Sequence, residues 1–375
     1  MSLPIKRQDV IDRVDEVARA CIAGRNDLYS TTSFPDAVWQ SLADRNLLGL
    51  SIPVAFGGLG GDYRMIAAAA HRLSEIGGVM GVTTTWLAHN INAKLHVFDK
   101  GSEPQRREWL PRLARGETSV CVAISEPGAG AHPKYLTTTA RRDGDVYVVD
   151  GEKAFLTNGP ISDLFIVLAI TAQVDGRKSF SAILVPRDTQ GFKETPGIEI
   201  DFLRPSPHCG IELSGCRVPC ANVLGNLDAG FVEISLPMRA VEDALTTAKF
   251  AGAMHAQLSE LARALPQEAG KEAVTAFGQL LDKARALSAS AMALAADLDE
   301  DDKDPQRLDP ISAGFRGFIM DLQVDIDGFV GDHVESPTER ATLMRHDLVK
   351  SLGIAATAHR IQSAKRAQSY IKGRD

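Results

Sequence analysis

The pattern of apolar and polar positions divides the chain into regions of different period. In residues 1–117 apolar side chains recur at three- and four-residue spacing, which predicts helices. The Gly-rich stretch Pro53–Asp62, PVAFGGLGGD, interrupts them and predicts a loop, because repeated glycine disfavours regular structure. The predicted helices are Asp9–Ile22, Pro35–Leu48, Tyr63–Ile76 and the shorter Pro104–Leu113.

Residues 118–226 change to short apolar or alternating runs typical of β-strands, and no segment of helical period intervenes. Turn dipeptides separate the runs. Asp143-Gly144 predicts a hairpin, and Asp150-Gly151 predicts a second turn shortly after it. The predicted strands are Val120–Ile124, Thr137–Arg142, Asp145–Val149, Lys153–Leu156, Phe165–Ile170, Ser181–Val185 and Gly210–Leu213.

Residues 227–375 return to helical spacing in long, Ala- and Leu-rich segments that favour an antiparallel bundle. Ser235 is placed to cap the first helix, and Pro237 lies in its first turn, where a missing N–H costs little. The acidic stretch 297–304, DLDEDDKD, predicts a solvated loop. The predicted helices are Ser235–Leu265, Glu272–Ala296, Pro310–Val330 and Glu339–Ile371.

The sequence therefore predicts an α+β chain of three domains. Residues 1–117 form a helical domain, residues 118–226 a barrel- or sandwich-like β-domain, and residues 227–375 a four-helix bundle. At 375 residues and 44% hydrophobic composition, the chain can bury two or three cores.

Charge and cysteine content narrow the functional class. A net charge of −7 and a pI near 5.8 argue against nucleic acid as a partner. No apolar stretch reaches the length of a membrane span, and the first thirty residues lack a secretory signal pattern, so we expect a cytoplasmic protein. The five cysteines are scattered and lack a second close pair, so we expect reduced thiols and no metal site.

One run in the middle domain concentrates chemical groups. Residues 121–160 read CVAISEPGAGAHPKYLTTTARRDGDVYVVDGEKAFLTNGP. The Gly-rich loop Ser125–Gly130 leaves a predicted strand and offers backbone N–H groups. The hydroxyls of Ser125 and Thr157 and the ring of Phe155 lie on successive strands and turns. Such groups suit a flat, hydrogen-bonding, anionic ligand such as a flavin or a CoA thioester.

The order of these pieces resembles the middle domain of the acyl-CoA dehydrogenase family, in which a TEPGAGSD loop and a GD-x-Y-x-x-x-G-x-K-x-W/F-I-T-N hairpin lie against the flavin ring. The loop Pro53–Asp62 resembles the family's iPeeyGGlG segment, and Val218–Gly225 resembles its VP-x-x-N-x-L-G exit from the β-domain. The helix–β–helix order also matches. The resemblance covers nearly the whole chain and is strongest in residues 45–235.

The resemblance implies an FAD-dependent acyl-CoA dehydrogenase. Such an enzyme removes the proton next to the thioester carbonyl with a carboxylate base, while flavin N5 accepts a hydride from the next carbon to give an enoyl-CoA. It also implies an electron-transfer flavoprotein as electron acceptor. A homodimer or homotetramer is expected, because the family buries its flavin between subunits.

The resemblance also assigns residues to cofactor and substrate. Gly130 and Ala131 fall where the family contacts the CoA moiety, although Ala131-His132 replaces the usual Ser-Asp and loses a hydroxyl contact. His89 falls where family members approach the acyl chain, but we interpret it as a core histidine. The positions implied for the cofactor are Val122, Ile124, Ser125, Phe155, Thr157 and Thr357.

The catalytic base departs from the usual family pattern. Many members carry a Glu in a late Y-E-G-T segment, but the equivalent here is Ala355, which cannot accept a proton. A minority, the isovaleryl- and long-chain-like enzymes, carry the Glu on the first bundle helix. Counting back from Ala251-Gly252 places Glu242 at that position, and desolvation there would raise its basicity. Asp243 is the alternative base.

Two elements that hold FAD in the family are not recognisable. The residue three before Phe277-Gly278 is Val274 rather than the Arg of R-x-x-F-G, and Gly331 is isolated where Q-x-x-G-G would be expected. Losing a charge-assisted phosphate contact would cost roughly 1.5–3 kcal/mol. Two alternatives therefore stay open: a non-catalytic or partner-dependent subunit of a hetero-oligomer, and a same-fold flavin oxidase or monooxygenase.

Overall fold

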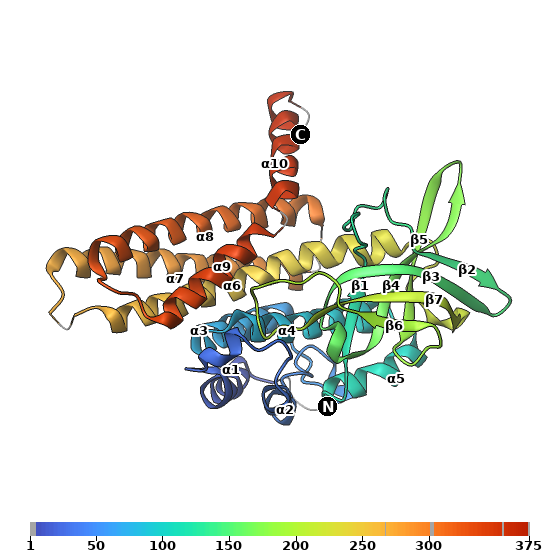
Figure 1. The fold of residues 1–375 in the computed structure, drawn as a ribbon, viewed down its shortest axis with the longest axis horizontal. Helices are drawn as coiled ribbons and strands as arrows, with labels where there is room; N and C mark the ends of the chain where they lie inside the picture. The colour runs from blue at the N-terminus through green and yellow to red at the C-terminus, as the bar shows by residue number, and fades with distance from the viewer. Residues whose placement is uncertain (1–4, 267, 301–303, 355, 374–375) are drawn as a thin grey trace.

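The computed structural model describes residues 5–266, 268–300, 304–354 and 356–373. Figure 1 shows a β-sheet at one end of an elongated helical body, with the N-terminal helices on one side of the long C-terminal helices. This helix–sheet–helix order is the predicted α+β fold, and it is confirmed. No helix in the described ranges is long and apolar enough to cross a membrane.

The N-terminal helices match the predicted ones and include one that the pattern did not predict. The Gly-rich loop remains irregular apart from a short 3₁₀ turn at Val54–Phe56. The unpredicted helix, α4, is buried on nearly every side, so no polar face marks its period. The helices are α1 (Arg7–Val17), α2 (Asp36–Asp44), α3 (Tyr63–Gly77), α4 (Met80–Ile91) and α5 (Glu103–Ala114).

The middle region forms one eight-stranded sheet in the order β6-β7-β3-β2-β4-β5-β8, with β1 paired in parallel to β4. The Asp143-Gly144 hairpin is confirmed, because β2 and β3 pair antiparallel with Asp143 opposite Val146. The strands are β1 (Ser119–Ala123), β2 (Thr139–Asp143), β3 (Val146–Thr157), β4 (Ser162–Val174), β5 (Arg177–Pro186), β6 (Phe192–Thr195), β7 (His208–Pro219) and β8 (Val223–Leu224).

The second predicted turn, at Asp150-Gly151, is wrong. Strand β3 runs unbroken through these residues, and its pairing with β7 shifts register between Val149 and Gly151. A Cβ at Gly151 would lie 2.8 Å from the Cα of Thr138. A glycine is therefore needed here because two backbones approach closely, and not because the chain reverses direction.

Helices α7 and α8 are longer than predicted, α6 agrees with its prediction to one residue at each end, and the last predicted helix is two. Helix α9 ends at Gly353, where Arg316 of α8 donates hydrogen bonds to the carbonyls of Ser351, Leu352 and Ile354. Helix α10 then leaves the bundle at a steep angle (Figure 1). The helices are α6 (Leu236–Ala264), α7 (Lys271–Asp299), α8 (Pro305–His333), α9 (Glu339–Gly353) and α10 (Ala356–Ile371).

Two predictions about helix ends in this region are wrong. Ser235 makes no capping hydrogen bond, because a π-helical turn, Phe231–Ser235, leads directly into α6 and leaves Ser235 in helical conformation. The acidic stretch is only partly a loop. Helix α7 extends to Asp299, whose carboxylate accepts hydrogen bonds from the backbone N–H groups of Tyr63 and Arg64 at 2.7 and 2.9 Å. Residues 301–303 lie outside the described ranges.

The helical regions share one hydrophobic core, while the sheet has clusters of its own. The shared core joins α1 and α3 to α6, α7 and α8. Helices α3 and α6 approach so closely that a Cβ at Gly252 would lie 2.1 Å from the carbonyl oxygen of His71. Helices α1 to α4 and the bundle are therefore one packed body, whereas α5 packs in a separate cluster with the strands β1, β4 and β5.

His89 is a buried core histidine, as predicted. Its Nε2–H donates to the carbonyl oxygen of Leu48, and its Nδ1 accepts from the hydroxyl of Ser119, both at 3.1 Å. A carbonyl can only accept, so these partners fix the neutral tautomer. Burial lowers the pKa of His89 to about 4.

Acid is therefore expected to destabilise the fold through His89. The folded-state pKa lies below the unfolded value of about 6.5, so its contribution is complete above pH 6.5 and is lost as the pH falls toward 4. When the pH is lowered from 7.5 to 5, the free energy of unfolding should fall by about 2 kcal/mol less in His89→Gln than in the wild type. The glutamine keeps one donor and one acceptor but does not titrate. Urea unfolding at both pH values measures this. Equal losses in the two proteins would contradict it.

Candidate functional site

A cavity of about 590 Å³ lies where the sheet meets α4 and α6. It brings together residues from strands, loops and helices that are far apart in the sequence. The residues that line it are Ala88, Ile91, Asn92, Val122, Ile124, Ser125, Ala129, Ala131, His132, Pro133, Phe155, Thr157, Phe231, Ser235, Leu236, Met238, Arg239 and Glu242.

Most of the residues predicted from the sequence line this cavity. Gly130 does not, but its neighbours Ala129 and Ala131 do. Thr357 lies in α10, and its side chain is outside the described part of the structure. Asp243 is half-buried and points toward Arg239, with 3.9 Å between Oδ2 and Nε. The predicted residues that line the cavity are Val122, Ile124, Ser125, Ala131, Phe155, Thr157 and Glu242.

A buried ion pair holds the Gly-rich loop against the sheet. The Glu126 carboxylate accepts hydrogen bonds from Lys153 Nζ at 2.9 Å, from the backbone N–H groups of Thr137 and Thr138, and from the Thr137 hydroxyl. The side chains of Glu126 and Lys153 are 4% and 0% exposed. Burial opposes ionisation, but the hydrogen bonds from Thr138 and the charge of Lys153 lower the pKa of Glu126 to about 2.

The sequence analysis gave no role to Glu126 or Lys153, although both lie within the segment 121–160. Burial lowers the pKa of Lys153 to about 8, against the opposing charge of Glu126. Both groups are therefore ionised at neutral pH. The pair fixes the strand end that presents Ser125 to the cavity, and a second bond from Ala154 N–H to the Ser125 carbonyl reinforces it at 2.8 Å.

Phe155 sits in strained backbone at the cavity wall. Its φ of 61° is in the left-handed region, which a bulky residue rarely adopts, and the β3–β7 pairing is irregular there. Its ring packs against His208 with 5.0 Å between centroids. Strain of this kind persists where surrounding structure enforces it, and it is concentrated at functional sites.

The cavity wall suits a flat heteroaromatic ring. Val122 and Ile124 give an apolar surface, and Phe155 adds an aromatic one. Within the described part of the chain, the hydroxyls of Ser125 and Thr157 form no hydrogen bond to another protein group. They remain available to a ligand whose edge carries hydrogen-bonding atoms. The residues present thus fit an isoalloxazine ring.

Glu242 brings a carboxylate to this cavity from the first turns of α6. Its side chain is open to the cavity, while protein surrounds it on the other sides. Burial raises its pKa to about 7; the charge of Asp243 raises it further, and that of Lys249 opposes the shift. A carboxylate with this pKa is a suitable general base near neutral pH.

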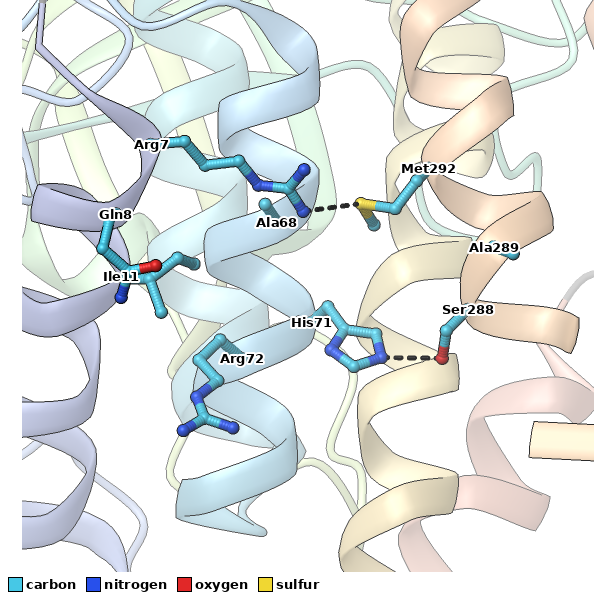
Figure 2. A pocket seen from close by; sticks show the side chains of 9 residues that line it. All are labelled: Arg7, Gln8, Ile11, Ala68, His71, Arg72, Ser288, Ala289 and Met292. Atoms are coloured by element: carbon cyan, nitrogen blue, oxygen red, sulfur yellow. Dashed lines mark hydrogen bonds between the residues drawn. The ribbon is translucent and has the colours of Figure 1, made fainter. Parts of the chain in front are cut away.

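A second hollow, of about 710 Å³, lies between α1, α3 and α7 (Figure 2). No sheet residue lines it. His71 and His255 both direct Nε2 at the hydroxyl of Ser288, at 2.8 and 3.1 Å, and Arg7 points toward the sulfur of Met292. Because these polar groups satisfy one another, we assign this hollow to helix packing.

In the described ranges, no group of three His, Cys, Asp or Glu side chains is placed to hold a metal ion. The five cysteines are free thiols. The candidate chemistry is therefore that of the cavity beside Glu242.

Two family models match the chain. The model described as "Acyl-CoA dehydrogenase, N-terminal domain" matches residues 6–117, and "Acyl-CoA dehydrogenase, middle domain" matches residues 121–215. These ranges hold α1 to α5 and reach into β7, and they include the strands and the Gly-rich loop that line the cavity.

Curated relatives match between 51% and 60% of the chain. An isovaleryl-CoA dehydrogenase of Pongo abelii is 31% identical over 194 residues, which are 51% of this chain and 45% of that protein. Probable acyl-CoA dehydrogenase YngJ of Bacillus subtilis is 32% identical over 228 residues, 60% of each chain. A 3-(aryl)acrylate reductase of Clostridium sporogenes is 29% identical over 55% of this chain and 54% of its own. The chain thus spans about half the length of the curated relatives it matches.

Solved structures share the fold over nearly the full length. The prolyl acyl carrier protein oxidase AnaB superposes with a TM-score of 0.83 at 22% identity, covering 98% of this chain and 100% of its own. Butyryl-CoA dehydrogenase of Megasphaera elsdenii superposes with a TM-score of 0.78 at 19% identity, covering 93% and 95%. Identities this low establish a common fold, including the C-terminal helices.

Proposed function

This chain belongs to the acyl-CoA dehydrogenase family, and we propose that it is an FAD-dependent oxidoreductase that oxidises the CH–CH bond next to the carbonyl of an acyl thioester. One observation carries the proposal. A carboxylate from α6, Glu242, and the ring-binding groups of the sheet line the same cavity.

Glu242 is the proposed base. Its side chain reaches the cavity from α6 and lines it together with Val122, Ile124 and Phe155. A substrate held between them would present its α-carbon to the carboxylate. The raised pKa makes Glu242 a stronger base than an ordinary carboxylate, and Lys249 limits the rise so that much of it stays ionised at neutral pH.

The sheet residues are proposed to hold the cofactor. When bound, FAD supplies a hydride acceptor at flavin N5. The Ser125 and Thr157 hydroxyls would hydrogen-bond to the edge of the ring, and Phe155 would pack near it. The Glu126–Lys153 ion pair keeps this wall rigid. Ala131, in the loop that we assign to the CoA moiety, also lines the cavity.

The remaining partners follow the family. We propose an acyl-CoA substrate, an electron-transfer flavoprotein as acceptor, a homodimer or homotetramer, and a cytoplasmic location. The missing arginine of R-x-x-F-G leaves a hetero-oligomer as the competing assembly.

The flavin spectrum of the purified protein tests the proposal. A yellow protein whose flavin absorbance bleaches under nitrogen on addition of an acyl-CoA, and which then reduces an electron-transfer flavoprotein, supports a dehydrogenase. Rapid reoxidation by oxygen with release of hydrogen peroxide indicates an oxidase instead. A colourless protein that copurifies with a related chain and reacts with no thioester in a panel would refute the proposal and favour a non-catalytic subunit.

A further inference from the structure

Two partly exposed residues lie next to the cavity on helices α4 and α6, which pack together. In α4 only Thr84 and Ala88 keep partial exposure, and they lie one turn apart on the same side of the helix. On α6, Glu242 and Thr246 are also accessible and lie one turn apart. Because Ala88 and Glu242 line the cavity, Thr84 and Thr246 lie one turn beyond its lining.

A buried lysine of α6, Lys249, reaches Thr84 at this place. Lys249 follows Glu242 by seven residues, which places the two on one face of α6 about 10.5 Å apart along the axis. Long side chains on a helix lean toward its N-terminus, so the ammonium group of Lys249 is carried back toward Glu242. Lys249 is only 5% exposed, and its Nζ donates to the hydroxyl of Thr84 at 3.0 Å.

The ammonium group is under-satisfied. Lys249 forms no ion pair with any residue that the structure describes, and Thr84 takes only one of its three N–H groups. The Thr84 hydroxyl donates in turn to the carbonyl of Met80 at 2.9 Å, so it can only accept from Lys249. The ring of Phe250, with its centroid 5.1 Å from Nζ, is the other partner of Lys249. A buried cation whose described contacts are all neutral is costly, and an incoming anion would offset that cost.

The nearby carboxylates act on Lys249 only through space. Burial lowers the pKa of Lys249 to about 8, while the charges of Glu242 and Asp347 favour its protonated form. Asp347 does not hydrogen-bond to Lys249: its Oδ1 accepts from the backbone N–H of Leu203 at 3.1 Å, and its buried Oδ2 has no hydrogen-bond partner among the described residues. Lys249 is therefore a cation at neutral pH, with two N–H groups to offer a ligand.

We propose that Lys249 determines substrate choice by binding a carboxylate at the far end of a short acyl chain. The inference rests on the proposed function and narrows it: the substrate is a monothioester of a dicarboxylic acid. The thioester lies at the cavity, its α-carbon lies beside Glu242, and its terminal carboxylate takes the two remaining N–H groups of Lys249.

Binding to a variant that does not turn over tests this assignment. In the flavin-loaded Glu242→Gln protein, calorimetry compares glutaryl-CoA with pentanoyl-CoA, which has the same chain length but ends in a methyl group. We expect glutaryl-CoA to bind at least about tenfold more tightly. Adding Lys249→Met should reverse this preference, and adding Lys249→Gln should abolish most of it.

Lys94 supplies a matched control, because it is half-buried but points toward the carbonyl of Gly61 and the ring of Tyr63. Lys94→Met should keep the preference for glutaryl-CoA. Equal affinity for both thioesters, or an equal loss of both on replacing Lys249, overturns the assignment and leaves the proposed function standing. If neither thioester binds, this assignment fails, and bleaching of the wild-type flavin by the panel of other acyl thioesters decides the proposed function separately.

Discussion

Replacing Glu242 by Gln is expected to abolish reduction of the flavin by substrate while leaving the flavin content unchanged. Glutamine has the shape of glutamate but cannot accept the α-proton. Because general-base catalysis commonly contributes between a hundredfold and ten-thousandfold, we expect the reduction rate to fall about a thousandfold or more. Glu242 touches no other described group through a hydrogen bond or ion pair, so the fold should tolerate the change. Stopped-flow bleaching of the flavin under nitrogen measures the rate.

Asp243→Asn is the matched control. Asp243 lies beside the base but is directed at Arg239. Its charge raises the pKa of Glu242, so the asparagine should shift the rate profile of flavin reduction toward lower pH without abolishing the reaction. The wild-type rate should rise with pH through about 7, where half of Glu242 is ionised, and level off roughly one pH unit higher. If the flavin of Glu242→Gln bleached at the normal rate and that of Asp243→Asn did not bleach, Asp243 would be the base instead of Glu242.

Replacing Glu126 by Ala is expected to destabilise the protein by about 3–5 kcal/mol and to empty it of flavin. The substitution leaves the Lys153 ammonium buried without its counter-ion and removes the acceptor for the N–H groups of Thr137 and Thr138. Removing one partner of a buried ion pair typically costs this much. The Gly-rich loop would also lose the contact that fixes Ser125 at the cavity. Chemical unfolding and the ratio of flavin to protein report the two effects.

Glu152 provides a comparison within the same hairpin. Its side chain is exposed, so Glu152→Ala should change stability by no more than about 0.5 kcal/mol. Glu126→Gln should fall between the two, because its single amide oxygen keeps the bonds to either Thr137 or Thr138 but not to both, and the charge is lost. A Glu126→Ala protein as stable and as yellow as Glu152→Ala would mean that the ion pair does not organise the loop.

The motif-bearing part of the chain was the most predictable. The turn dipeptide Asp143-Gly144, the Gly-rich loop and the strand alternation specify local structure, and they place Ser125, Phe155 and Thr157 on one wall. Glu242 could also be found, although only by counting along a helix that the resemblance had identified. Its role as base remains a prediction. The chemical groups could thus be identified from the sequence, but the cavity that brings them together results from tertiary packing.

Other features depend on contacts that the sequence pattern does not carry. Helix α4 was missed because it is buried on nearly all sides, which removes the polar stripe that reveals a helix. The turn at Asp150-Gly151 was wrong because the glycine accommodates Thr138 instead. The break before α10 depends on Arg316 from another helix. Lys249 is visible in the sequence as the one charged residue of the stretch 244–254. Its position beside the cavity, however, is known only from its contact with Thr84.

The carboxylate of Asp299 has a consequence for how the chain is made. It accepts hydrogen bonds from the first N–H groups of α3. The ribosome synthesises α3 more than two hundred residues before it reaches Asp299. The opening of α3 must therefore wait for the far end of α7 before it is complete. During synthesis the sheet, whose pairings are all internal, can mature first, and the two helical halves close together only afterwards.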